Sequence, residues 1–243
     1  ENNTLGFDGT INDYTVTLTD DGSFTGLGLG LSGITSVSSA GANNTLAFST
    51  SSNQVNRYID WQITDANSGL VRVATISGSD TVYSNETNFD GFVNLVGSGE
   101  DDSFTFTTGA GPTYGSISGS IRGISIDDTS IIGSETNTIV GHELASSWTI
   151  ESGGNITVTE TDDTVVLNSY ISASSFINAL QGSDTVTDQF TVEDENGFAG
   201  AIVGGDSASD TLTVNQGGSD TDTLWDLNST STVSRRDISG ASP

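Results

Sequence analysis

Residues 94–106 read NLVGSGEDDSFTF, and this stretch decides the fold that we expect. Residues 178–192 read NALQGSDTVTDQFTV and repeat it. Both begin with Asn and an apolar residue, pass through an acidic Gly-Ser turn, and end on Phe-Thr followed by an apolar residue. Internal repetition of this kind indicates a stacked, quasi-one-dimensional architecture, whose common use is reach or adhesion rather than catalysis.

Tryptophan occupies equivalent positions in three successive copies. Trp61 precedes Phe104 by 43 residues, Trp148 precedes Phe190 by 42, and Trp225 begins a further partial copy. Equivalence across copies favours packing at a corner of the repeat over a ladder that stacks on sugars. We expect one continuous elongated domain with four segments: a partial N-terminal repeat (1–40), two fuller copies (41–132 and 133–204), and a partial repeat with the C-terminal tail (205–243).

Apolar and polar residues alternate through most of the chain. Residues 15–19, 104–106, 156–159 and 211–214 place Val, Ile, Leu or Phe at every second position, with Thr between them. A period of two is typical of strands buried on one face, and Gly-Asp-Ser clusters between the runs are typical of turns. The sequence therefore predicts an all-β protein.

Two all-β architectures fit this pattern. In a parallel β-solenoid, a β-helix or β-roll with irregular long repeats, each turn of the chain stacks its apolar residues on those of the next. In tandem β-sandwiches, each domain of about 100 residues packs two antiparallel sheets. Short strands, frequent Gly-Asp-Ser turns and few large aromatic residues favour the solenoid.

The charge balance excludes several partners. The 243 residues contain 32 Asp and Glu against five Arg and no Lys, for a formal net charge of −27. Nucleic-acid binding lacks the basic surface it requires, and the same charge disfavours binding to or insertion into anionic membranes. Cys is absent, which excludes disulfides, Cys-ligated metals and thiol nucleophiles. The composition indicates an extracellular or cell-surface location.

The repeat resembles those of large secreted bacterial adhesins, namely filamentous-haemagglutinin-like and RTX-type Gly-Asp-rich surface proteins. The resemblance rests on residues 61–64, 94–106, 115–119, 148–205 and 210–212, and it covers most of residues 41–227. It implies an elongated β-rich stalk or adhesive surface, forming one stretch of a fibre.

Calcium is the ligand that the acidic turns suggest most directly. Residues 205–213 keep the first Gly, the Asp and the apolar position of the calcium-binding nonapeptide G-G-x-G-x-D-x-U-x, and lose its other two glycines. Solvated acidic turns explain the same residues without a metal. The candidate calcium ligands are Asp101, Asp102, Asp184, Asp188, Asp206 and Asp210.

Catalytic chemistry finds little support in the sequence. His142 is the only His and is followed by Glu143, but Ser146 stands where a zinc-protease helix needs its second His. Paired acids at 20–21, 127–128 and 162–163 would suit glycoside hydrolysis, yet nothing distinguishes one pair from another. We expect no catalytic site.

These observations predict a structural or adhesive segment of an extracellular bacterial fibre, a stiff acidic stalk stabilised by calcium. Its partners would be neighbouring copies, adjacent repeats of a longer chain, or cell-surface carbohydrate. The alternatives are a self-assembling filament or surface-layer subunit, and a carbohydrate-active enzyme on a β-helix.

Overall fold

The computed structural model describes residues 3–9, 12–26, 29–50, 56–107, 115–123, 135–141, 146–151, 156–160, 166–167, 177–193, 200–206, 209–215, 223–227 and 232–237. Every regular element in these ranges is a β-strand, so the all-β prediction is confirmed. The same ranges contain no helix of the length and apolarity that crossing a membrane would demand.

The strands form three open sheets. In spatial order, the eleven-stranded sheet contains β1 (Thr4–Phe7), β5 (Ser36–Ser39), β9 (Asp80–Asp90), β8 (Ser68–Ser77), β7 (Arg57–Asp65), β11 (Asp101–Phe106), β13 (Asn137–Val140), β17 (Ala179–Gln181), β19 (Ala201–Val203), β22 (Thr232–Asp237) and β21 (Thr223–Leu227). The six-stranded sheet contains, in the same sense, β12 (Ile121–Arg122), β10 (Asn94–Val96), β6 (Thr45–Ser49), β2 (Thr15–Thr19), β3 (Ser23–Gly26) and β4 (Leu29–Ser32). The five-stranded sheet contains β16 (Val166–Leu167), β15 (Ile156–Glu160), β14 (Ser146–Ile150), β18 (Gln189–Val192) and β20 (Thr211–Val214).

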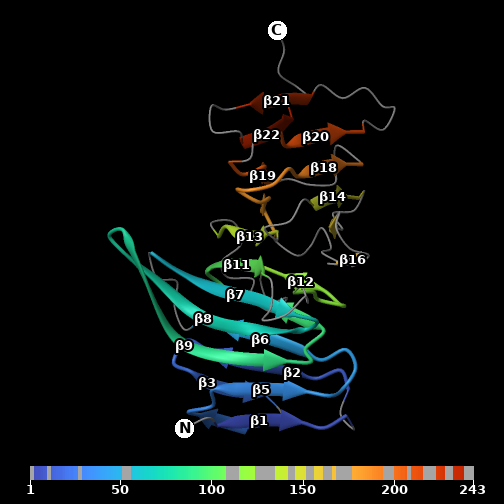
Figure 1. The fold of residues 1–243 in the computed structure, drawn as a ribbon. Coiled ribbons are helices and arrows are strands. Elements are labelled where there is room, and N and C mark those ends of the chain that lie inside the picture. Colours follow the sequence, from blue (N-terminus) through green and yellow to red (C-terminus); the bar gives the residue numbers. More distant parts are fainter. Residues whose placement is uncertain are drawn as a thin grey trace.

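The chain crosses repeatedly between the eleven-stranded sheet and one of the other two. In the first half it alternates with the six-stranded sheet, through β1–β2, β5–β6, β9–β10 and β11–β12. In the second half it alternates with the five-stranded sheet, through β13–β14, β17–β18 and β19–β20. Figure 1 shows the result as layers stacked from the N-terminus (blue) to the C-terminus (red).

Parallel pairing brings apolar residues from successive crossings into one row. Trp61, Phe104, Ile139, Leu180 and Ile202 are successive Cα partners across β7, β11, β13, β17 and β19. All five are buried. Because a strand turns every second residue to the same face, parallel neighbours in register place like residues over like. The core is therefore continuous along the stack.

The six-stranded sheet supplies the opposite wall of this core in the first half of the chain. Val16, Leu46, Leu95 and Ile121 are successive partners across β2, β6, β10 and β12. Each is buried in the same apolar cluster as Trp61. Alternation of period two thus decides which face of each sheet points inward.

The two tryptophan intervals correspond to neighbouring parallel strands. Trp61 is the Cα partner of Phe104 and stacks on it with ring centroids 5.5 Å apart, and Trp148 stacks on its partner Phe190 at 5.4 Å. Both indoles are fully buried, which confirms the packing interpretation for these two. The pairs lie in different sheets, however, because β7 belongs to the eleven-stranded sheet and β14 to the five-stranded one. Trp225 lies on β21, and its side chain is outside the described part of the structure.

Asparagine side chains tie each layer to the next where the strands begin. The Oδ1 atom of Asn137 accepts the backbone N–H of Asp102 at 3.0 Å, and that of Asn178 accepts the backbone N–H of Asn137 at 2.7 Å. Asn94 Oδ1 accepts the backbone N–H of Ser120 at 3.0 Å in the same way. Side-chain amides that satisfy neighbouring backbone groups explain the Asn that opens each copy of the repeat.

Antiparallel hairpins interrupt the parallel stack. The longest is formed by β7, β8 and β9, and it projects beyond the other layers in Figure 1. Its outer part carries the exposed side chains of Ile76, Val82 and Tyr83. Arg72 stacks on the Tyr83 ring, with its guanidinium carbon 3.5 Å from the ring centroid, and donates from Nε to Asp60 at 2.8 Å. The repeat gave no indication of this insertion.

Candidate functional site

The acidic turn between β10 and β11 is organised around Asp102. Its Oδ2 atom accepts the backbone N–H of Ser98 at 2.7 Å and the Ser98 hydroxyl at 3.3 Å, and its Oδ1 atom accepts the indole N–H of Trp61 at 3.0 Å. A Cβ on Gly97 would collide with Oδ2, so the turn requires glycine there. The carboxyl group thus holds the turn against the core tryptophan.

The turn between β17 and β18 repeats the arrangement around Asp188. Its Oδ2 atom accepts the backbone N–H of Ser183 at 2.6 Å, and its Oδ1 atom accepts the backbone N–H of Ser146 at 3.1 Å. A side chain at Gly182 would meet Asp188 Oδ2, as at Gly97. The Gly-Ser…Asp segment of both copies is therefore a turn closed by its own aspartate, although the segment is one residue longer in the second copy.

Burial changes the acidity of both groups. Asp102 is 1% exposed, and burial raises its pKa from 3.8 to about 8, against the opposing effect of the hydrogen bonds from Trp61 and Ser98. Burial also raises the pKa of Asp188, to about 6, and the N–H groups of Ser183 and Ser146 oppose it. Because desolvation disfavours the carboxylate form, Asp102 is mostly protonated at neutral pH.

The other four candidate calcium ligands lie in these turns or in the next one along the stack. Asp101 Oδ1 accepts the backbone N–H of Thr136 at 2.7 Å. Asp184 Oδ1 accepts the backbone N–H of Asp206 at 3.3 Å, and Asp210 Oδ1 accepts that of Asp188 at 2.9 Å. The structure thus brings Asp184 to Asp206 and Asp188 to Asp210, and keeps Asp101 with Asp102 in a different turn.

These aspartates point mainly at backbone N–H groups rather than at a shared centre. Within the described ranges, no three His, Asp or Glu side chains gather as a metal ligand set would. The calcium hypothesis stays a prediction. His142 and the acid pairs at 127–128 and 162–163 lie outside the described residues.

The pair at 20–21 has structural contacts. Asp20 and the buried Glu100 both accept from Arg57, with Arg57 Nη2 3.2 Å from Asp20 Oδ2 and Arg57 Nε 2.7 Å from Glu100 Oε2. Asp21 closes its own turn by accepting from Thr19 and Ser23, and these hydrogen bonds lower its pKa to about 2. Both carboxylates therefore have hydrogen-bond partners within the fold.

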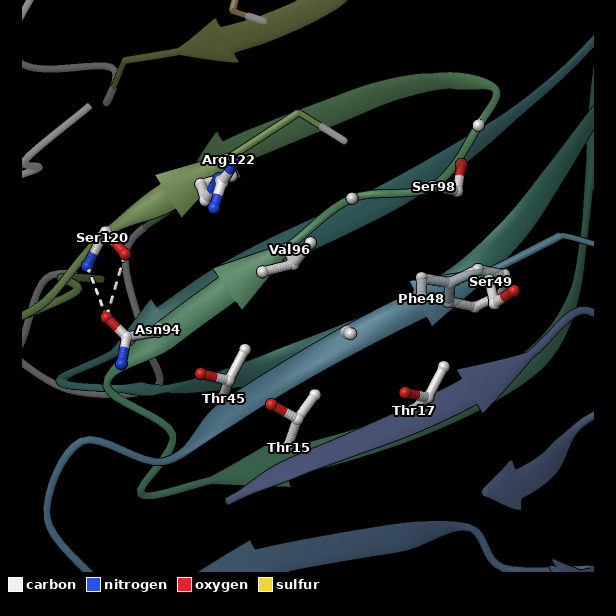
Figure 2. Close-up of a pocket in the computed structure, with 13 residues that line it drawn as sticks. Thr15, Thr17, Thr45, Phe48, Ser49, Asn94, Val96, Ser98, Ser120 and Arg122 are labelled. Carbon is white, nitrogen blue, oxygen red and sulfur yellow. Dashed lines mark hydrogen bonds between the residues drawn. The ribbon is translucent and has the colours of Figure 1, made fainter. Parts of the chain in front are cut away.

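A groove of about 770 Å³ lies over the outer face of the six-stranded sheet, opposite the core (Figure 2). Hydroxyl and amide side chains dominate its walls. The lining residues are Thr15, Thr17, Thr45, Ala47, Phe48, Ser49, Asn94, Val96, Gly97, Ser98, Gly99, Ser120 and Arg122. Sequence reasoning did not identify this site, because it took the alternate Thr and Ser residues only as strand formers.

The register of the sheet orders these side chains into rows. Thr15, Thr45 and Asn94 are successive Cα partners across β2, β6 and β10, and Asn94 Oδ1 accepts from both the backbone and the hydroxyl of Ser120. A second row ends on Arg122 of β12, the Cα partner of Val96. The alternation of Thr and Ser on the outward positions was the signal that would have located the groove.

A smaller cavity of about 290 Å³ lies where β11 of the first half meets β13 and β17 of the second half. It is bordered by the 182–185 turn, including Asp184, and by Thr105, Val140 and Gln181. Its volume lies at the lower end of the range for small-molecule pockets, about 300–1,000 Å³.

Comparisons of the chain with protein-family models, with curated proteins and with solved structures found no match.

Proposed function

We propose that the chain is a structural, adhesive segment of an extracellular bacterial surface or secreted fibre, built as a stiff acidic parallel β-solenoid. One crossing from the eleven-stranded sheet to its partner sheet and back would be one coil. The observation that carries the proposal is the parallel, in-register stacking of Trp61, Phe104, Ile139, Leu180 and Ile202 along five strands. Parallel rows of this kind are typical of a solenoid, whereas tandem sandwiches are built mainly from antiparallel pairs.

The mechanism of such a segment is mechanical. Each layer contacts chiefly its neighbours, so a continuous core and hydrogen-bonded backbone ladders resist bending along the stack. The net charge of −27 keeps the surface hydrated and repels other copies. No catalytic residue is needed for this role, and adhesion would depend on side chains displayed on the outer faces of the sheets.

Calcium would strengthen the stack if it bridges carboxylates of adjacent turns. Asp184 and Asp206 are the best pair, since they lie on neighbouring turns and Asp206 is exposed. Calcium prefers carboxylate and carbonyl oxygens, which these turns supply.

A self-assembling filament subunit is a second candidate, favoured by the ends of the sheets. β1 is the terminal strand of the eleven-stranded sheet and β20 that of the five-stranded sheet. A strand at the end of a sheet presents backbone groups that pair readily with another chain.

Sedimentation velocity and thermal unfolding by circular dichroism, each with and without millimolar calcium, test these alternatives. We expect an elongated monomer whose melting temperature rises with calcium. The rise should be absent in Asp184→Asn and retained in Asp80→Asn, a matched loss of charge at the exposed end of β9. A melting temperature that does not change with calcium would contradict the calcium hypothesis. Large particles would favour the filament subunit, and a compact shape in sedimentation would contradict the proposal of an elongated stalk.

A further inference from the structure

We infer that the groove on the six-stranded sheet is a glycan-binding site that recognises a single carboxylated sugar through Arg122. This inference deepens the adhesive part of the proposed function and rests on it.

The groove differs in charge from the rest of the molecule. In a chain with 32 acidic residues, none of the described side chains that line it is acidic. Among the described lining residues Arg122 alone is charged, and the hydroxyl and amide groups come from β2, β6, β10 and the turns beside β10 and β12 (Figure 2). A described lining that offers one cation and no carboxylate is suited to an anionic ligand.

Within the described residues no ion pair of Arg122 is found, whereas Arg57 and Arg72 each pair with carboxylates. Arg57 pairs with Asp20 and Glu100, and Arg72 lies 2.8 Å from one carboxylate of the hairpin and 3.6 Å from another. The Nε atom of Arg122 is buried and has no hydrogen-bond partner in the described structure. A guanidinium carries five N–H donors in a planar fork that matches a carboxylate, and a buried donor is seldom left unpaired.

The hydroxyl rows indicate what the rest of the ligand is. Thr15, Thr45 and Asn94 form a polar row across three strands, and the row beside it runs from Thr17 through Ala47 and Val96 to Arg122. Side chains that both donate and accept suit the hydroxyl groups of a sugar. Phe48 lines the groove but is 2% exposed, so the described lining offers no open ring on which a neutral sugar would stack.

The net charge limits how acidic the ligand can be. A polyanion would be repelled by a chain of net charge −27, whereas one carboxylate on an otherwise neutral glycan would meet Arg122 at short range. An acidic peptide would also supply a carboxylate. The strand beside the arginine, β12, has only two residues, however, and gives such a peptide little edge to pair with.

Isothermal titration calorimetry with sialyllactose and with lactose tests the inference, because the two probes differ by one carboxylated sugar. We expect sialyllactose to bind at least ten-fold more tightly than lactose. Arg122→Gln should abolish that preference, and Thr45→Val should weaken sialyllactose binding several-fold. Arg236→Gln removes the same charge at β22, outside the described lining of the groove, and should leave binding unchanged.

Ionic strength provides a second readout. Sialyllactose affinity should hold or rise between 20 and 150 mM NaCl, because salt screens the repulsion from the whole chain more than the short-range contact with Arg122. Failure to bind either sugar, equal affinity for both, or tighter binding of a pentaglutamate peptide would each overturn the assignment. If the protein is an elongated monomer and gives any of these results, the glycan site is wrong but the stalk proposal stands. If the protein is compact and binds the glycan, the stalk proposal is wrong but the glycan site stands.

Discussion

The turns around Asp102 and Asp188 are built from the same residues, yet they satisfy their core tryptophans differently. Trp61 donates its indole N–H to Asp102 at 3.0 Å. The Nε1 atom of Trp148 is buried and has no hydrogen-bond partner in the described structure, although the indole lies close enough to Asp188 to lower its pKa. Asp188 Oδ1 instead accepts the backbone N–H of Ser146.

This difference shows which contacts of the turn are common to both copies of the repeat and which contact varies between them. Both turns need glycine, serine and an aspartate that accepts the serine N–H. The second oxygen of the aspartate is free to bind a core side chain or a neighbouring strand. The turn is the same in both copies, but the second aspartate oxygen binds a different group in each. The same motif can therefore occur next to two different sheets.

Truncating the tryptophans should have the largest effect on stability. Trp61→Ala and Trp148→Ala should each lower the free energy of unfolding by about 3–5 kcal/mol, the cost of a large core cavity. The loss should be greater for Trp61, whose ring contacts Phe48, Phe89 and Phe104. Urea denaturation followed by circular dichroism measures both.

Ile76→Ala, at the exposed end of the β8–β9 hairpin, is the matched control and should change stability by less than about 0.5 kcal/mol. A Trp148→Ala variant as stable as this control would mean that the second half of the stack does not depend on its core.

The pH dependence of stability should distinguish the two aspartates. The folded-state pKa is raised to about 8 for Asp102 and to about 6 for Asp188, so folding favours the protonated form of each. Stability is therefore lost as pH rises from about 4 towards the folded pKa, with a slope approaching about 1.4 kcal/mol per pH unit for each group.

The free energy of unfolding is measured between pH 4 and 9 for the wild type, Asp102→Asn and Asp188→Asn. Subtracting the value of a variant from that of the wild type isolates the contribution of one aspartate, because the contributions of the other carboxyl groups cancel. The difference in unfolding free energy between wild type and Asp102→Asn should keep falling to about pH 8. The corresponding difference for Asp188→Asn should level off near pH 6. Two differences that level off at the same pH would show that the turns are equally solvated.

Much of this architecture follows from the sequence, because strands buried on one face show apolar residues at every second position. The runs at 15–19 and 104–106 become β2 and the end of β11, and the tryptophan-to-phenylalanine intervals turn out to join parallel neighbours. The assignment of Trp61 and Trp148 to different sheets was not predictable, since each sheet presents the same alternation.

The acidic turns and the groove show where such prediction ends. The calcium hypothesis rests on a spacing that resembles a known ligand pattern, and it stays a prediction. No sequence pattern locates the backbone N–H groups from which the aspartate oxygens accept hydrogen bonds. Arg122 gave no signal in the sequence, because the pairing of an arginine depends on which side chains lie near it in space, and its Nε atom has no hydrogen-bond partner among the described residues.

Removing only the indole N–H should sharpen the comparison of the two turns. Trp61→Phe loses the hydrogen bond to Asp102, whereas Trp148→Phe removes a buried donor whose contact with Asp188 is too weak in geometry to count as a hydrogen bond. Because both changes lose similar packing, Trp61→Phe should cost about 1–2 kcal/mol more than Trp148→Phe. Urea denaturation at pH 6 gives the difference, and equal costs would mean that the Trp61–Asp102 bond contributes nothing net.

Removing the serine hydroxyls should produce the smallest effect on stability. The two hydroxyls differ in whether they contact the aspartate that closes the turn. Ser98 Oγ accepts the backbone N–H of Glu100 at 3.0 Å and donates to Asp102 Oδ2 at 3.3 Å. The Ser183 hydroxyl contacts the backbone and hydroxyl of Thr185, both within its own turn. Ser98→Ala should therefore cost about 1 kcal/mol, and Ser183→Ala about half of that.

The same pair of variants has a consequence for acidity that a purely local role would not produce. The Ser98 hydroxyl is one of the groups that lower the pKa of Asp102, so its removal should raise that pKa further. Carboxyl chemical shifts followed by NMR titration measure this change, with Ser183→Ala as the control that leaves Asp102 unmoved. An unchanged Asp102 titration in Ser98→Ala would assign the closing of this turn to the backbone N–H alone, and the two turns would then be equivalent in everything except their tryptophans.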